Sequence, residues 1–324
     1  MCIVTYGSAT ELPGCLESLR HLEAPVAEVV VVDCAGGDDS PQVAREEGAG
    51  LPLEVVALGE NRGFAGGMNV AIERTRSPFV LSLNADARPE PDFVARLLER
   101  IEAHPGLAVG AVTGRLLRPA APGEPRRLDA CGMRLVPTWR HLDRASGEID
   151  RGQLERPERV FGATGAATLF RRQALLDAAL DGEVFDQAFH SFREDAELCF
   201  RLRERGWEIL YEPRAVAEHR RWNLPERRQA MPPAVNRHSL KNRYLLRAYH
   251  QTGRNFVRTF LPTLLRDLLA LGYVVLRERS SLGAYGWLWH HRHEIHRRRR
   301  RIQARRRVPA AEIDRWFWHA GEPL

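Results

Sequence analysis

The chain has few cysteines and almost no lysine, and no long apolar run is free of charged residues or proline. Its five cysteines are scattered without a close pair, which excludes a cysteine-rich zinc module and argues against a disulfide framework. No collagen-like triplet, heptad run or longer repeat occurs. The first residues lack a basic region followed by an apolar stretch, so we expect no signal peptide. These absences favour a globular protein of a reducing, cytoplasmic compartment.

The remaining composition is that of a folded protein with an uneven distribution of charge. Hydrophobic residues make up 44% of the 324 residues, which excludes a disordered chain and is enough for about two domains. Residues 277–307 hold eleven arginines and two glutamates, so this segment alone exceeds the net charge of +6 of the whole chain. Because Lys241 is the only lysine, the use of arginine is general, and no single arginine indicates a phosphate contact.

Short apolar strands alternate with helical segments over the first hundred residues. We expect strands at residues 2–6, 28–33, 53–58 and 78–83, and helices at residues 12–22, 41–47, 66–74 and 91–103. This alternation is typical of a parallel α/β sheet covered on both faces. Residues 118–159 predict loops and short strands, and residues 194–205 predict a helix. We therefore expect an α/β domain over residues 1–225 and a helical, arginine-rich region over residues 226–324.

Acidic and imidazole side chains follow several of the predicted strands, where parallel sheets bind their ligands. Asp33 ends the second strand, and Asn84 and Asp86 follow the fourth. A carboxylate in such a place can hold a hard divalent cation, although taken alone a capping or turn aspartate is the more common explanation. His219, after a later strand, can ligate a metal as neutral imidazole or serve the structure alone.

Two further segments carry residues that suit catalysis or ligand binding. Glu194, Asp195 and Glu197 stand at the start of a predicted helix, where acids complement the helix dipole but can also supply a general base. Residues 61–69 predict a glycine-rich loop between a strand and a helix, and glycine allows the backbone to approach a ligand closely. The glycine spacing fits neither a Walker A motif nor a dinucleotide fingerprint.

Taken in order, these segments resemble the inverting glycosyltransferase family 2, and most of all its bacterial rhamnosyltransferase-like and galactofuranosyltransferase-like members. The resemblance rests on residues 4–8, 31–33, 61–69, 83–86, 165–172, 194–201 and 241–244, together with His219. It implies a GT-A fold, with a mostly parallel sheet flanked by helices. Residues 1–225 would be the catalytic domain that binds a nucleotide-sugar, and residues 226–324 a basic helical extension.

The resemblance also implies a role for each matching residue. Asp195 would be the general base, with Glu194 beside it, and Asp86 and His219 would hold Mg or Mn. The implied donor-binding residues are Thr5, Tyr6, Asp33, Asn61, Gly63, Gly66, Asn69 and Asn84. The sequence departs from the family at Cys34, where asparagine is usual, and at Asn84, which replaces the first acid of the Asp-X-Asp-type motif.

The resemblance implies a metal-dependent inverting transfer of a sugar from a UDP- or dTDP-sugar to a hydroxyl of a glycan or lipid-linked acceptor, in cell-envelope polysaccharide synthesis. A sugar-nucleotide nucleotidyltransferase is the alternative of similar fold, but it predicts a basic glycine-rich loop after the first strand, whereas the first basic residue is Arg20. A non-enzymatic nucleic-acid binder that uses Arg297–Arg301 and Arg305–Arg307 is the second alternative, and we favour it less.

The C-terminal region adds a prediction that no motif explains. Residues 256–276 place apolar residues at helical spacing, interrupted by charges such as Arg258 and Asp267, and predict an amphipathic helix rather than a membrane span. Trp287, Trp289 and the arginine-rich stretch follow. Together they predict peripheral attachment to an anionic surface, the inner face of the cell membrane. Packing on the catalytic domain or a homodimer is the alternative.

Overall fold

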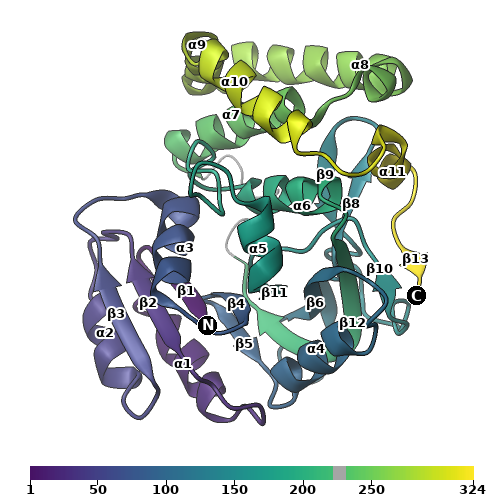
Figure 1. Cartoon of the computed structure of the whole chain (residues 1–324). Helices are drawn as coiled ribbons and strands as arrows, with labels where there is room; N and C mark the ends of the chain where they lie inside the picture. The colour runs from purple at the N-terminus through teal and green to yellow at the C-terminus, as the bar shows by residue number, and fades with distance from the viewer. Residues whose placement is uncertain (222–230) are drawn as a thin grey trace.

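A computed structural model describes residues 1–221 and 231–324, and Figure 1 shows how its elements are arranged. The strands are β1 (Cys2–Thr5), β2 (Val29–Asp33), β3 (Leu53–Ala57), β4 (Phe79–Asn84), β5 (Ala87–Pro89), β6 (Val109–Arg118), β7 (Arg127–Ala130), β8 (Met133–Val136), β9 (Arg140–Asp143), β10 (Glu158–Arg159), β11 (Ala167–Arg171), β12 (Glu208–His219) and β13 (Glu322–Pro323). The helices are α1 (Leu12–Arg20), α2 (Ser40–Glu47), α3 (Gly63–Arg74), α4 (Phe93–Glu102), α5 (Arg172–Ala178), α6 (Glu194–Glu204), α7 (Pro233–His250), α8 (Gly253–Arg277), α9 (Gly283–His290), α10 (Arg292–Ala304) and α11 (Ala310–Asp314), with short 3-10 turns η2 (Arg279–Leu282) and η3 (Arg315–Phe317).

The central sheet runs in the order β13-β10-β12-β6-β11-β4-β1-β2-β3. Strands β3, β2, β1 and β4 are parallel neighbours, as the alternation of strands and helices predicts. Strand β11 lies antiparallel between β4 and β6, and β6 pairs in parallel with β12. The short β5 pairs antiparallel with the end of β12, which places His219 opposite Ala87. This last pairing brings the end of β12 to the segment that follows β4.

The sheet is buried on both faces because its strands are apolar on both sides. In β2, Val30 and Val32 belong to one apolar cluster, and Val29 and Val31 belong to the other. The first cluster includes residues of α3, α5, α6 and α7, and the second includes residues of α1 and α4. The two-sided burial that a run of valines predicts for a parallel strand is therefore confirmed.

The C-terminal region shares the core of the α/β part. Trp316 and Phe317 are buried in the same apolar cluster as Phe200 of α6. The ring of Trp139, between β8 and β9, stacks on Phe200 at 5.8 Å between ring centroids and contacts Phe317 at 4.8 Å. The predicted domain boundary at residue 225 lies outside the described residues.

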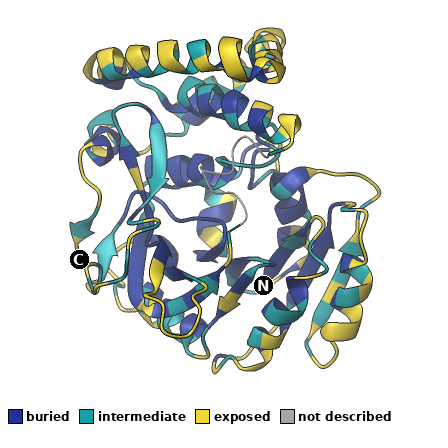
Figure 2. Cartoon of the chain, turned by 180° about the vertical axis from the view of Figure 1, so that it is seen from behind, coloured by how far each residue is buried: buried dark blue, intermediate teal, exposed yellow. Residues whose placement is uncertain are grey.

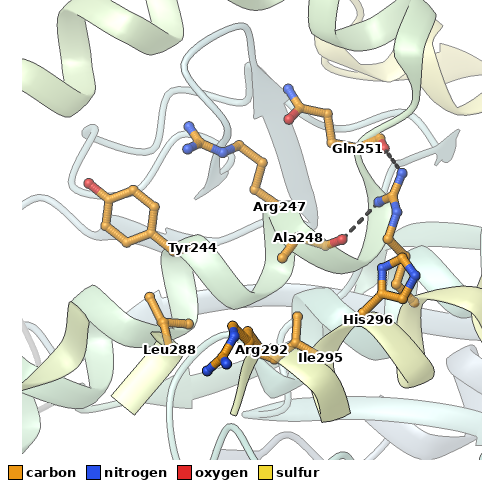
Figure 3. Close-up of a pocket in the computed structure, with 9 residues that line it drawn as sticks. Tyr244, Arg247, Ala248, Gln251, Leu288, Arg292, Ile295 and His296 are labelled. Atoms are coloured by element: carbon orange, nitrogen blue, oxygen red, sulfur yellow. Dashed lines mark hydrogen bonds between the residues drawn. The ribbon is translucent and has the colours of Figure 1, made fainter. Parts of the chain in front are cut away.

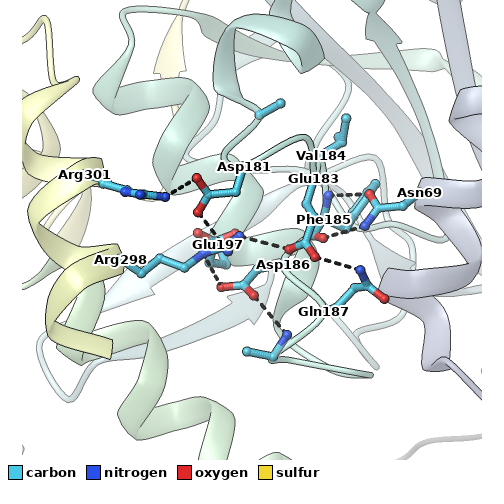
Figure 4. A network of polar contacts seen from close by, with 12 residues as sticks. Asn69, Asp181, Glu183, Val184, Phe185, Asp186, Gln187, Glu197, Arg298 and Arg301 are labelled. Carbon is cyan, nitrogen blue, oxygen red and sulfur yellow. Dashed lines mark hydrogen bonds and ion pairs between the residues drawn. The ribbon is translucent and has the colours of Figure 1, made fainter. Parts of the chain in front are cut away.

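Part of the arginine run of α10 lies against the α/β part, as Figure 4 shows for Arg298 and Arg301. Arg298 is largely buried, and its Nε lies 2.9 Å from Oδ2 of Asp186. Arg301 pairs with Asp181, and Arg299 donates hydrogen bonds to carbonyl groups at the end of α7. These contacts correct the expectation that the whole run is free to meet lipid or nucleic acid, because Arg298 and Arg301 pair with acids of the fold, whereas Arg297 and Arg300 remain exposed.

Helix α8 confirms the predicted helix at residues 256–276, and it lies at the outer end of the molecule, farthest from the sheet (Figure 1). Among the described residues it is the one helix long and apolar enough to cross a membrane, judged by length and composition alone. Only 17% of its apolar window is buried in the structure.

Candidate active site

Polar side chains collect where the parallel strands end. Thr5 at the end of β1 stands in register with Asp33 at the end of β2, and its hydroxyl donates a 2.9 Å hydrogen bond to Oδ1 of Asp33. The other carboxylate oxygen of Asp33 accepts from the amide of Ala35 at 3.0 Å. Tyr6 follows β1 and is 60% exposed. The buried Asp33 is thus held in one orientation beside an exposed aromatic ring.

The two predicted metal ligands are brought together. Oδ1 of Asp86 lies 3.3 Å from Nε2 of His219, and Nδ2 of Asn84 lies 3.3 Å from the same nitrogen. Within the described part of the chain, no group of three or more histidine, cysteine or acidic side chains is arranged to hold a metal ion. The protein therefore offers one carboxylate and one imidazole, which suits an ion whose remaining ligands are phosphate oxygens and water.

Asp129 of β7 orients the imidazole, and sequence reasoning missed it. Its Oδ2 lies 2.7 Å from Nδ1 of His219, so Nε2 faces Asp86. Burial lowers the pKa of His219, but hydrogen bonds and charge from Asp129 and Asp86 outweigh it and raise this pKa to about 9. Arg221 contacts Asp129 as well. Asp129 lies in a segment of irregular strands, where no spacing relates it to His219.

The start of α6 holds the predicted base. Arg193 enters the helix with a left-handed backbone, at φ 72°, and Glu194 and Asp195 form the first turn. The Asp195 carboxylate accepts hydrogen bonds from the amides of Gly165 at 3.2 Å and Ala196 at 2.8 Å. Burial raises the pKa of Asp195 to about 6. Burial and the neighbouring Asp195 raise the pKa of Glu194 well above its usual range.

Residues 165–166 connect the candidate base at the start of α6 with the segment that follows β4 and carries the candidate metal ligand. Gly165 donates its amide to Asp195, and the carbonyl of the adjacent Ala166 accepts from the amide of Asn84 at 2.8 Å. The candidate base and the start of the metal-ligand segment are therefore attached to consecutive residues. Gly165 is closely packed, since an added Cβ would lie 3.1 Å from the ring of Phe64.

Glu197, the third acid of the cluster, has a different role. Both of its carboxylate oxygens accept from Arg201, at distances of 2.6 to 3.0 Å. Although burial opposes it, the charge of Arg201 and a hydrogen bond from His250 lower the pKa of Glu197 to about 2. A fully paired, permanently ionised carboxylate that is buried in the core is a structural group, so only the first two acids of the helix remain available for chemistry.

The glycine-rich segment is mainly helical, which corrects the interpretation of residues 61–69 as a loop. Helix α3 begins at Gly63, and Oδ1 of Asn61 accepts from the amide of Gly63 at 2.8 Å. Gly63 has a φ of +65°, and an added Cβ would lie 2.4 Å from the carbonyl oxygen of His190. At Gly66 a Cβ would lie 2.5 Å from Cβ of Arg62. Close packing, rather than an open turn, requires these glycines.

Two asparagines attach the segment before α6 to the rest of the site. Asn69 of α3 accepts from the amide of Phe185 and donates to its carbonyl, both at 2.8 Å. Asn242 of α7 donates to the carbonyls of Phe189, Ser191 and Phe192. In this structure Asn69 therefore positions the segment that leads to Asp195. Residues 241–244 contribute to the family resemblance, but the sequence assigns Asn242 no role, and its contacts with the segment before α6 follow from the structure alone.

The contact between Gly63 and His190 leads to a stability prediction. Replacing Gly63 by alanine forces a side chain into a left-handed backbone and against a carbonyl oxygen, so we expect the free energy of unfolding to fall by about 1–3 kcal/mol. Urea unfolding followed by circular dichroism measures this loss. Gly59→Ala is the control, because an added Cβ there meets nothing within 4 Å. Equal stability of both variants would contradict the contact.

A separate hollow lies between α7 and the helices α9 and α10 (Figure 3). Its volume is about 460 Å³, and arginines 247, 292 and 299 are among its lining residues. Arg247 is already paired with Asp267 at 2.5 Å, and Arg299 is bonded to the end of α7. None of the candidate catalytic or donor-binding residues lines this hollow, so it belongs to the packing of the helical region.

Comparison with known proteins agrees with this geometry. A family model described as Glycosyl transferase family 2 matches residues 1–177. A poly-beta-1,6-N-acetyl-D-glucosamine synthase of Staphylococcus epidermidis is 25% identical over 226 residues, which cover 66% of this chain and 48% of that protein. The succinoglycan biosynthesis protein ExoO of Rhizobium meliloti is 31% identical over 135 residues, or 39% of this chain and 38% of that protein. The chain thus spans about half the length of the first of these relatives.

Solved structures share the fold at low sequence identity. TarS 1-349 of S. aureus, crystallised with UDP-GlcNAc, has a TM-score of 0.56 at 15% identity, over 98% of this chain and 89% of that one. A mannosyltransferase of Pyrobaculum calidifontis, with GDP-Man and Mn2+, has a TM-score of 0.53 at 20% identity, over 96% of this chain and 76% of that one. The expected GT-A fold is confirmed. By its family model and its fold, the chain belongs to glycosyl transferase family 2.

Proposed function

We propose that this glycosyltransferase moves a sugar, with inversion, from a UDP- or dTDP-sugar to a hydroxyl of a glycan or lipid-linked acceptor in cell-envelope polysaccharide synthesis, at the inner face of the cell membrane. One observation carries the proposal. The Asp195 carboxylate accepts a hydrogen bond from the amide of Gly165, and the amide of Asn84 donates one to the carbonyl of the next residue, Ala166. The half-buried carboxylate of Asp195, whose pKa is raised, is thereby connected to the segment that carries Asp86.

In this proposal the strand ends bind the donor. Asp33, held by Thr5 and Ala35, would accept hydrogen bonds from the base or ribose, and Tyr6 would lie against the nucleotide. The remaining donor-binding residues would be Asn61, Gly63, Gly66, Asn69 and Asn84. Asn69 would act through the backbone of Phe185, since its amide group is already bonded there.

Asp86 and His219 would hold a divalent cation, Mg or Mn. The pair fits such an ion because a carboxylate oxygen and an imidazole nitrogen converge, 3.3 Å apart, and Asp129 orients the ring. When bound, the ion supplies positive charge to a diphosphate leaving group. The Pyrobaculum mannosyltransferase structure and that of GalNAc-T7 both contain Mn2+, which supports the assignment.

Asp195 would remove the proton from the acceptor hydroxyl as that oxygen attacks the anomeric carbon. The amides of Gly165 and Ala196 hold the carboxylate in place, so it needs no reorientation during the reaction. Glu194 would stay protonated beside it, because burial and Asp195 raise its pKa. One displacement on the face opposite the leaving group gives inversion.

The competing functions lose their supporting features. The match to the family model for glycosyl transferase family 2 argues against the nucleotidyltransferase alternative. The nucleic-acid alternative relied on the arginines of residues 297–301 and 305–307, and it is weakened because Arg298 and Arg301 pair with acids of the fold. A hydrolysis screen of UDP-, dTDP- and GDP-sugars, with the Asp195→Asn variant as the blank, tests the proposal. Hydrolysis of no donor, or equal hydrolysis by the variant, would contradict it.

The pKa of Asp195 predicts the pH dependence of the reaction. A general base acts only when it is deprotonated, so we expect kcat to rise with pH through about 6 and to level off above it. Below the transition, kcat should fall about tenfold per pH unit if one proton is responsible. Initial rates between pH 4.5 and 8, at saturating donor and acceptor, measure this profile. A flat profile across that range would exclude Asp195 as the titrating base.

A further inference from the structure

The outward side of helix α8 is made of large apolar side chains. We call this surface the outer face of α8 and define it by Val257, Leu261, Leu265, Leu268, Leu269 and Leu276. The exposed fraction of each of these residues lies between 57% and 76%. Figure 2 shows α8 at the edge of the molecule, exposed along most of its length. So large a contiguous apolar surface marks a site of interaction.

The inward side of the same helix is mainly polar, with Val274 as its buried apolar residue. Buried Thr259 accepts a 3.2 Å hydrogen bond from the indole N–H of Trp139, and Thr263 donates a 3.0 Å hydrogen bond to the carbonyl of Pro137. Asp267 pairs with two arginines of α7, at 2.8 and 2.5 Å. This polarity is the reverse of that of a helix on the surface of a soluble protein, which turns its apolar side inward.

The inward contacts decide how α8 can meet a membrane. A helix that crossed the bilayer would have to leave Trp139 and the arginines of α7, and would carry Asp267 into hydrocarbon. A helix that keeps these contacts lies along the surface of the protein, with only its outer face free. The arrangement therefore fits a helix parallel to a membrane surface, as in interfacial attachment.

The charges around the outer face distinguish a lipid surface from a second copy of the chain. Exposed arginines stand at both ends of the helix, with Arg254 and Arg258 at its start and Arg277 at its end, followed by Arg279. Asp267, the one acid of α8, is already paired with Arg243 and Arg247 of α7. Two copies packed through α8 would bring arginines against arginines in either helix direction. An anionic surface meets the same charges with attraction.

We propose that the outer face of α8 docks on an anionic lipid bilayer, with the helix axis parallel to the membrane and its flanking arginines among the headgroups. Trp289, which is 67% exposed, would join this contact. Trp287 would not, because it stacks on His291 at 4.0 Å and lies beside Lys241. The docking proposal rests on the proposed function only for its purpose, since docking would bring the enzyme to a lipid-linked acceptor.

The test is co-sedimentation of the full chain with vesicles of phosphatidylcholine containing 30% phosphatidylglycerol, without donor or acceptor. We expect Leu265→Asp to weaken binding at least tenfold, and Leu261→Asp to do the same. Leu176→Asp is the matched control, because Leu176 of α5 is 60% exposed and Leu265 is 59% exposed. The control should bind as the unmodified chain does. All three substitutions add the same charge, so only their place differs.

Three results would overturn the proposal. They are equal binding by Leu265→Asp and Leu176→Asp, binding to pure phosphatidylcholine that is as tight as to the anionic vesicles, and failure of the unmodified chain to bind either. A dimer in analytical ultracentrifugation that Leu265→Asp dissociates would assign the face to a second copy. No sugar is transferred in the vesicle assay, so its result does not depend on whether the proposed function is correct. Donor hydrolysis by a chain that does not bind vesicles would refute docking and leave the proposed function standing.

Discussion

Replacing Asp195 by asparagine is expected to lower kcat by a hundredfold or more, while the affinity for the nucleotide-sugar stays within about twofold. General-base catalysis contributes ~10²–10⁴ to a rate, and it acts on the acceptor in the transition state, so donor binding is spared. Asparagine keeps the shape of the side chain and can still accept the hydrogen bond from Gly165. Steady-state kinetics and calorimetric titration of the donor measure the two effects separately.

Glu194→Gln is the matched control for this experiment. Burial and the neighbouring Asp195 raise the pKa of Glu194 well above its usual range, which favours the protonated form that glutamine imitates. We expect this variant to keep kcat within about tenfold of the unmodified enzyme. An inactive Glu194→Gln beside an active Asp195→Asn would mean that the other carboxylate is the base.

Removing the divalent cation is expected to abolish transfer, and Asp86→Ala is expected to weaken donor binding at least tenfold. Asp86 is one of two side chains that converge on the proposed cation position, so its loss leaves only His219. Activity after exhaustive treatment with EDTA, and its recovery with added Mn2+, measure the first effect. Electron paramagnetic resonance of bound Mn2+ measures the loss of the site without any turnover.

Asp39→Asn serves as the control for the cation experiment, because it removes an exposed aspartate at the start of α2. Asp129→Asn should give an intermediate result, since partners that orient a metal-bound histidine typically contribute 10–100-fold to metal affinity. Full activity after thorough chelation would refute the cation assignment. Unchanged Mn2+ binding by Asp86→Ala would place the ion elsewhere.

The sequence predicted the parts of the site that depend on strand ends. Asp33 and Asp86 follow runs of apolar residues that can only be buried strands, and parallel strands bring their carboxyl ends to one edge. The start of α6 was predicted equally well, because Glu194 opens a strongly helical segment that ends before Gly206. In each case the information is local, within a few residues of the functional side chain.

The residues that sequence reasoning missed act across long separations in the chain. Asp129 meets His219 across 90 residues, and Asn242 holds carbonyls about 50 residues before it. Pairings of this kind come from the packing of the sheet and of α7, and no periodicity records them. The misjudged arginine run has the same cause, since the acids that pair with Arg298 lie more than 100 residues earlier.

The burial of Asp195 also has a consequence for the stability of the protein. An aspartate in an unfolded chain has a pKa of about 3.9, whereas burial raises that of Asp195 to about 6 in the fold. Between these pH values the folded protein holds a proton that the unfolded chain has released, so stability falls as the pH rises through this window. Below this pH window Asp195 is protonated in both the folded and the unfolded chain, so it does not lower the stability there. The ionised form that can accept a proton is therefore the form that the fold stabilises least, so the proposed role of Asp195 as a base at neutral pH would come at a cost in stability.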